Sequence, residues 1–208
     1  MNILAIGAHF DDVELGCGGT IARHVLKGER VHIYVATHSG YTSQTKLTIR
    51  NKRIAYEEGK RAARILGVEL ICGNIETLRL EFTEELNSEL LKLIEEKKID
   101  LIYTHWIGDI HHDHASLAKA TLHAGRHVKR LLMYRSNWYH SNIDFRANFY
   151  VDITNVWKIK EKAIMAHKSE YNRIGKRWLQ FFKNEAENAG QRIGVGLAEA
   201  FELVKWIE

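Results

Sequence analysis

Residues 3–19, ILAIGAHFDDVELGCGG, join an apolar run to a polar, glycine-rich segment near the start of the chain. The run from Ile3 to Ala8 has the length and composition of a central parallel strand that is covered on both faces. His9 and the adjacent carboxylates of Asp11 and Asp12 follow it directly. Charged groups at the end of a buried strand are costly unless another group neutralises or uses them. This stretch therefore predicts a buried first strand that ends in a functional site.

Strand-like and helix-like segments alternate along the rest of the chain. Further strands are expected at residues 31–37, 68–72, 100–104, 131–134 and 149–153, and helices at 20–26, 48–66, 83–98, 115–128, 156–167, 173–187 and 196–207. The alternation predicts a Rossmann-like, three-layer α/β fold with a mostly parallel sheet. The expected strand order is 3-2-1-4-5, with an extra strand and a helical C-terminal part. A length of 208 residues is typical of one domain.

A second polar stretch, Gly108–His114 (GDIHHDH), follows the fourth expected strand. In a sheet of this order the first and fourth strands are neighbours. A crevice opens at their carboxyl ends because the chain winds in opposite directions on either side. The topology therefore brings the two polar stretches to one cleft, although they lie far apart in the sequence.

The residue types in these stretches are those of a catalytic metal site. His9 and Asp12 are three positions apart, so they project from one side if the chain turns helical after the strand. With His114 they make two nitrogens, one carboxylate and an open position, the pattern of catalytic zinc. The same set also suits non-haem iron(II). We therefore expect Zn²⁺ as the cofactor, with Fe²⁺ as the alternative.

Three neighbouring side chains are candidates for catalysis. Asp11 is adjacent to a ligand and can reach a metal-activated water as a general base. His111 can act as an imidazolium that stabilises an oxyanion or protonates a leaving amine. Asp113 is placed to fix the tautomer of a histidine. Adjacent aspartates at a helix start also occur as simple caps, but the histidine cluster after a buried strand favours the metal site.

Composition and the absence of other motifs exclude several classes of function. Lys and Arg number 30 against 26 Asp and Glu, a net charge of +4 with both signs mixed along the chain, so no nucleic-acid partner is expected. The two cysteines form no CxxC motif, which suits a reducing, cytoplasmic location. No apolar run approaches the roughly 18 residues of a membrane span, and no signal-peptide pattern is present. Residues 16–19, GCGG, do not match the dinucleotide-binding GxGxxG.

Two motifs resemble those of the LmbE-like or PIG-L-type N-acetylglucosaminyl deacetylases. The opening motif of that family, (P/A)HPDD(V/E)E before a glycine-rich turn, is similar to residues 8–14, AHFDDVE. Its second motif, HPDH, is similar to residues 111–114, HHDH. The similarity continues at residues 62–67, 150–153, 166–169 and 198–202. Phe10 and His112 replace the prolines of the two motifs, so other contacts must shape these loops.

The resemblance implies one LmbE-like deacetylase domain over residues 1–208, which removes an N-acetyl group from an N-acetylglucosamine-type amino sugar or sugar conjugate. It implies His9, Asp12 and His114 as zinc ligands. It further implies Asp11 as the base, His111 as a charged electrophilic partner, and Asp113 as the residue that supports His111.

An arginine near the start of the second helix often contacts substrate in such enzymes, and Arg50 and Arg53 are both candidates. Arg135, Asn137 and His167 are further candidates to line the cleft. Leu197 stands where many members carry a tyrosine.

Two alternative functions stay open on the sequence. One is a metal-dependent hydrolase of another acyl amide or of an ester. The other is a non-catalytic, Rossmann-like protein that binds a sugar or a nucleotide. A homo-oligomer is expected because the last helix, residues 196–207, is strongly apolar.

Overall fold

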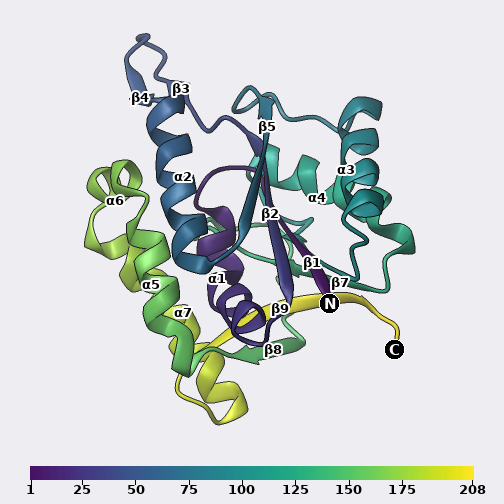
Figure 1. Cartoon of the computed structure of the whole chain (residues 1–208). Coiled ribbons are helices and arrows are strands. Elements are labelled where there is room, and N and C mark those ends of the chain that lie inside the picture. The colour runs from purple at the N-terminus through teal and green to yellow at the C-terminus, as the bar shows by residue number, and fades with distance from the viewer.

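One seven-stranded sheet forms the centre of the computed structural model, which describes residues 1–208 (Figure 1). Its strands are β1 (Asn2–Gly7), β2 (Arg30–Thr37), β5 (Glu69–Ile75), β6 (Leu101–His105), β7 (Arg130–Tyr134), β8 (Phe149–Asp152) and β9 (Ala198–Trp206). A separate hairpin consists of β3 (Tyr41–Thr42) and β4 (Thr48–Arg50). The helices are α1 (Asp12–Leu26), α2 (Lys52–Leu66), α3 (Glu84–Glu96), α4 (His112–Ala124), α5 (Trp157–Met165), α6 (Lys168–Ile174) and α7 (Lys176–Ile193).

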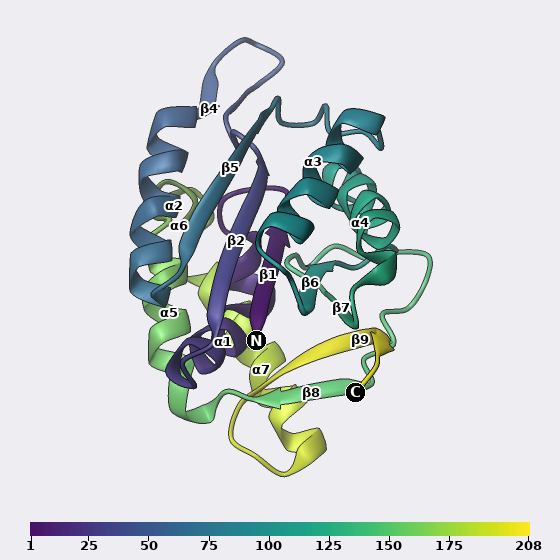
Figure 2. The same ribbon diagram turned by 45° about the vertical axis from the view of Figure 1, so that its right-hand side comes forward.

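The order of the strands in the sheet is β5-β2-β1-β6-β7-β9-β8 (Figure 2). Neighbours from β5 to β7 pair in parallel, and β9 pairs antiparallel with both β7 and β8. The expected order 3-2-1-4-5 is confirmed in β5-β2-β1-β6-β7, and the extra strand is β8. The predicted α/β class is therefore correct.

Helices cover both faces of this sheet, with α2, α5 and α7 on one side and α3 and α4 on the other (Figure 1). Successive side chains of β1 enter two different cores because a strand alternates its side chains between faces. Ile3 and Ala5 pack in the core that includes Val13 of α1, whereas Leu4 and Ile6 pack in the core of α3 and α4. Burial on both faces explains why the strand has a continuous apolar sequence.

Helix α1 begins at Asp12, earlier than the expected start at residue 20, and its backbone kinks at Cys17. The Glu199 carboxylate, from β9, accepts hydrogen bonds from the backbone N–H groups of Gly19 and Thr20 and so caps the part of α1 beyond the kink. A Cβ on Gly16 would lie 2.0 Å from the Tyr134 ring. The glycines expected to form a turn thus allow close packing inside a helix.

The expectation of a helix over residues 196–207 is wrong, because Ala198–Trp206 form the strand β9. Ala, Glu, Leu and Lys favour helices only weakly, and tertiary pairing overrides such preferences. Here β9 fills the gap between β7 and β8. This segment therefore supplies no apolar helix for the expected homo-oligomer. None of the helices is both long and apolar enough to cross a membrane.

Candidate functional site

The loops that follow the parallel strands gather at one edge of the sheet and line a cavity of about 300 Å³. Parallel winding places the carboxyl ends of these strands on the same side. Predicted site residues in the cavity wall are His9, Asp11, Asp12, Arg50, His111 and His114. Asp113 is fully buried beside His9, and Arg53 is exposed outside the cavity.

His9 lies in the loop between β1 and α1, with one ring nitrogen held by a carboxylate. Its Nε2 is 2.9 Å from Oδ2 of Asp113. Asp113 is itself fixed, because it accepts hydrogen bonds from the backbone N–H groups of Leu78 and Leu80. A proton on Nε2 leaves the lone pair of Nδ1 free, and Nδ1 faces His114 across 3.2 Å. The partner of Asp113 is thus His9, whereas the resemblance implied His111.

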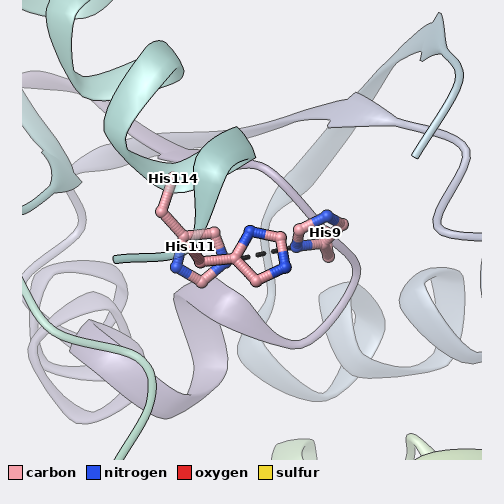
Figure 3. A group of neighbouring side chains, drawn as sticks. All are labelled: His9, His111 and His114. Atoms are coloured by element: carbon pink, nitrogen blue, oxygen red, sulfur yellow. Dashed lines mark hydrogen bonds between the residues drawn. The ribbon is translucent and has the colours of Figure 1, made fainter. Parts of the chain in front are cut away.

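His114 has the same arrangement in the first turn of α4 (Figure 3). Its Nδ1 lies 3.0 Å from Oδ2 of Asp109. Asp109 also accepts hydrogen bonds from the backbone N–H of His111 and from the side-chain amide of Asn137. The lone pair of His114 Nε2 is therefore directed towards His9. A carboxylate behind each imidazole is the usual support of metal-bound histidines.

Asp12 completes the cluster from the first position of α1. Its Oδ2 accepts a hydrogen bond from the backbone N–H of His9 at 2.7 Å, and its Oδ1 accepts one from the Ser136 hydroxyl at 2.9 Å. Oδ2 lies 3.4 Å from His9 Nδ1, and the other oxygen, Oδ1, lies 3.3 Å from His114 Nε2. Ligand atoms about 2.0–2.1 Å from a tetrahedral zinc ion lie about 3.3 Å from one another. The three side chains therefore fit one divalent metal ion.

Charges within this cluster are strongly coupled. Burial alone would lower the pKa of His114, but the carboxylates of Asp12 and Asp109 outweigh burial and raise that pKa to about 10. Burial would raise the pKa of Asp12, yet His114 and His105 hold it well below its usual range. The centre of the cluster thus favours positive charge, which a metal cation supplies.

His105, at the end of β6, offers a second arrangement with Asp12 and His114. Its Nε2 accepts a hydrogen bond from the backbone N–H of Ala8 at 3.0 Å, so its lone pair is already used. Burial lowers the pKa of His105 to about 4, which keeps this ring neutral. His9 is therefore the better third ligand.

Asp11 precedes α1 with an unusual backbone conformation, φ 128° and ψ −25°. L-residues rarely adopt positive φ, and such strain is concentrated at functional sites. Its Oδ2 lies 3.3 Å from Nη1 of Arg50, which also donates to the carbonyl of Phe10 at 3.0 Å. Burial raises the pKa of Asp11 to about 7 against the opposing charge of Arg50. A carboxyl group with a pKa near neutrality therefore lies in the cavity wall, next to Asp12 in the chain.

His111 stands at the N-terminus of α4, stacked on His114 with ring centroids 4.3 Å apart. Its Nδ1 has no hydrogen-bond partner. Burial and the charge of His114 lower the pKa of His111 to about 4. The following residue, His112, is exposed and does not line the cavity.

Arg50 is buried among three carboxylates. Besides Asp11, its guanidinium lies 3.7 Å from Glu58 and 3.8 Å from Glu170. Glu58 in turn accepts hydrogen bonds from the backbone N–H and hydroxyl of Ser169. The arginine thus connects the loop before α1 to α2 and α6.

Several residues of the site were not identified from the sequence. Asp109 lies in the quoted histidine-rich stretch, but only its contact with His114 reveals what it does. Ser136, Glu170 and Arg173 also line the cavity, and nothing in their local sequence distinguishes them. Asn137 lines the cavity as expected, whereas His167 is fully buried with Nε2 3.4 Å from Glu14.

A Rossmann-like sheet with a His–Asp–His cluster at its carboxyl edge defines an α/β protein with a candidate metal site. A model of the GlcNAc-PI de-N-acetylase (PIG-L) family matches residues 4–125, so the chain belongs to this family. It is 31% identical over 183 residues to the uncharacterized deacetylase YaiS of Escherichia coli K12, covering 80% of this chain and 90% of YaiS.

Further relatives span nearly the whole chain. Diacetylchitobiose deacetylase of Thermococcus kodakarensis is 26% identical, over 99% of this chain and 84% of its own length. The structure of N,N'-diacetylchitobiose deacetylase from Pyrococcus horikoshii superposes with a TM-score of 0.83 at 23% identity, covering 98% of this chain and 83% of that one. The 4-carboxy-2-hydroxymuconate hydratase GalB from Pseudomonas putida has the same fold, with a TM-score of 0.77 at 20% identity over 100% and 97% of the two chains. Likeness at this level of identity shows the fold alone.

Proposed function

We propose that this chain, as one domain over residues 1–208, is a zinc-dependent deacetylase that removes the N-acetyl group from an N-acetylglucosamine-type sugar or conjugate. The observation that carries the proposal is the pair of carboxylate-bound histidines. Asp113 and Asp109 each hold one ring nitrogen of His9 and His114, and the other two nitrogens lie 3.2 Å apart beside the carboxylate of Asp12. Burying these charged and polar groups together raises the free energy of the folded protein unless a cation is bound between them.

His9, Asp12 and His114 would hold the metal. Bound zinc lowers the pKa of a water molecule from about 15.7 to about 7, which provides hydroxide at neutral pH. Iron(II) fits the same donor set. The cluster leaves one side open to the cavity, as a hydrolytic site requires.

Asp11 is the proposed general base. It lines the cavity beside the ligands and is held by Arg50, so its carboxylate can accept the proton of the attacking water. His111 is proposed to donate a hydrogen bond to the oxyanion that forms when water adds to the acetyl carbonyl. The unpartnered Nδ1 and the position of the ring in the cavity wall support this role. One such donor typically contributes about 10²–10³ in rate.

Amino-sugar chemistry is proposed from the family and from the deacetylases that the chain resembles. Burial of Arg50 in the cavity wall supports it over Arg53 as the arginine of the site. Its contact with Asp11 indicates that it positions the base as well as facing the substrate.

Metal analysis and a deacetylation assay test the proposal together. We expect about one zinc ion per chain, and acetate and free amine released in equal amounts from one member of a panel of N-acetylglucosamine derivatives. Chelation should abolish release, and added Zn²⁺ should restore it. Release only from other amides or from esters would contradict the substrate class.

Asp11→Asn separates the enzyme from a binding protein. Loss of a general base lowers kcat by about 10²–10⁴, whereas the metal content should stay unchanged because Asp11 contributes no ligand. Asp144→Asn, in an exposed loop, is the matched control and should leave both unchanged. Full turnover in Asp11→Asn would contradict the role of Asp11. If the wild type turns over no substrate and Asp11→Asn binds sugar as the wild type does, the protein is the non-catalytic alternative.

A further inference from the structure

Arg50 meets a different carboxylate at each of its three guanidinium nitrogens. Nη1 lies 3.3 Å from Oδ2 of Asp11. Nη2 lies 3.7 Å from Oε2 of Glu58, and Nε lies 3.8 Å from Oε1 of Glu170. Arg50 and both glutamates are buried. Glu170 lines the cavity of the candidate site together with Arg50 and Asp11, whereas Glu58 does not line it. A substrate in this cavity therefore meets Arg50 but not Glu58.

The position of Glu58 is fixed by two helices. Glu58 lies in α2, and its two carboxylate oxygens accept hydrogen bonds from the backbone N–H of Ser169 at 2.7 Å and from the Ser169 hydroxyl at 2.6 Å. Ser169 belongs to α6, which packs against α2. The next residue of α2, Gly59, lies against Phe10, since a Cβ there would be 2.3 Å from the Phe10 ring. Glu58 is thus anchored beside the loop between β1 and α1.

Arg50 in turn holds the backbone at Asp11. Its Nη1 donates to the carbonyl of Phe10 at 3.0 Å, and the Phe10 N–H donates to the Ser39 hydroxyl at 2.8 Å. Asp11 has a φ of 128°, and L-residues keep such a conformation only where the surrounding contacts impose it. The position of the Asp11 carboxylate thus depends on where the Arg50 guanidinium lies.

The other two carboxylates limit how Arg50 pairs with Asp11. A guanidinium group that is free to turn pairs with a carboxylate through two parallel N–H groups. Arg50 instead donates to a single oxygen of Asp11, because its other nitrogens face Glu58 and Glu170. Without the charge of Glu58, Nη2 loses its partner and the guanidinium turns towards Asp11. That movement displaces the Asp11 carboxylate and engages both of its oxygens.

We propose that Glu58 is a positioning residue of the reaction: through Arg50, it holds the carboxylate of Asp11 where this carboxylate can accept the proton of the attacking water. The proposal rests on the deacetylase function proposed above. In this role Glu58 touches neither the substrate nor the metal ligands. A displacement of about 1 Å at a reacting group can lower the rate by about 10²-fold, so the effect belongs in kcat rather than in KM.

Steady-state kinetics of Glu58→Gln, alone and combined with Arg50→Gln, test this role. In Glu58→Gln we expect kcat to fall by about 10-fold or more, KM to stay within about threefold and the zinc content to stay unchanged. In the Arg50→Gln background, the same substitution should lower kcat by less than about twofold, because Glu58 acts through Arg50 alone. A merely structural Glu58 predicts the same loss in both backgrounds.

Two further variants control for charge and for folding. Glu57→Gln removes an exposed carboxylate of α2 that pairs with Lys60, and it should leave kcat unchanged. Ser169→Ala removes only the hydroxyl that donates to Glu58 and keeps every charge, so it should fold even if Glu58→Gln does not. Its kcat should fall by about two- to fivefold, because a smaller displacement of the base has a smaller effect. In the Arg50→Gln background, Ser169→Ala should have no effect on kcat.

A crystal structure of Glu58→Gln, or of Ser169→Ala if the former does not fold, separates this inference from the proposed reaction. If the wild type deacetylates no substrate, the deacetylase function fails and the crystal structure alone decides the inference. A second hydrogen bond from Arg50 to Asp11, or a shift of the Asp11 carboxylate by about 1 Å or more, would support it. Unchanged positions of both side chains would overturn it.

With an active wild type, two results would overturn the inference and leave the deacetylase function standing. One is wild-type kcat in both Glu58→Gln and Ser169→Ala. The other is an equal loss of kcat from Glu58→Gln in the presence and in the absence of Arg50.

Discussion

His9 and His114 of the candidate metal site each have one ring nitrogen facing the other histidine and one held by a carboxylate. Asp113 holds His9, and Asp109 holds His114. Each aspartate also accepts hydrogen bonds from backbone N–H groups, so its position depends on the fold and not on the metal. At the scale of single residues, Asp113 and Asp109 therefore fix the positions of the two histidines.

Asp109→Asn and Asp113→Asn should each weaken zinc binding by about 10- to 100-fold, because losing such a carboxylate leaves the histidine tautomer and ring orientation unfixed. Competition with a fluorescent chelator measures the zinc Kd of each variant. Asp144→Asn is the control for removing a carboxylate from an exposed loop. Wild-type affinity in both variants would show that the carboxylates do not support the ligands.

At the scale of elements, α1 is the helix that connects the candidate site to the sheet. It begins at Asp12, and both Asp12 and Leu15 line the cavity. The helix reaches this position because Gly16 lies directly against Tyr134, whose hydroxyl donates to the carbonyl of Ile6 at 2.7 Å. The glycines bring the helix close to the sheet.

Gly16→Ala and Gly18→Ala form a matched pair in this helix. The added Cβ at Gly16 would lie 2.0 Å from the Tyr134 ring, whereas at Gly18 the nearest atom is 3.6 Å away. Overpacking typically costs about 1–3 kcal/mol, so Gly16→Ala should lower the free energy of unfolding by at least that amount. Gly18→Ala should be neutral or stabilising by about 0.5–1 kcal/mol, because Ala restricts the unfolded chain. Urea denaturation measures both, and equal effects would contradict this packing role.

At the scale of the whole molecule, the last strand lies inside the sheet. β9 is bonded on both sides, to β7 and β8, and Phe201 is fully buried. The part of the sheet beyond β7 therefore forms only when the C-terminal segment pairs with β7. The hairpin of β3 and β4, in contrast, has only two strands and carries the exposed Leu47 and Ile49 at its end.

Native-state hydrogen exchange should separate these two regions. The β9 amides should exchange only through global unfolding, with a free energy that falls with urea as the global value does. The β3–β4 amides should exchange through local opening at a much lower free energy. Fast exchange along β9, at the rate seen in the hairpin, would show that this strand is not part of the cooperative core.

The amino-acid sequence alone was enough to predict the parallel order of the central strands and the meeting of two distant polar stretches. Apolar runs and helical periodicity are local signals, and the winding rule of α/β sheets converts them into a topology. His9, Asp12 and His114 could be named in this way because they lie in the loops and first helical turns that follow β1 and β6.

The folded structure was needed to show which carboxylate supports which histidine, that Arg50 rather than Arg53 lines the cavity, and that residues 198–206 form a strand. These depend on loop conformations and on pairing between segments far apart in the chain. Side-chain partners are chosen by distance in the folded state, which neither periodicity nor composition encodes.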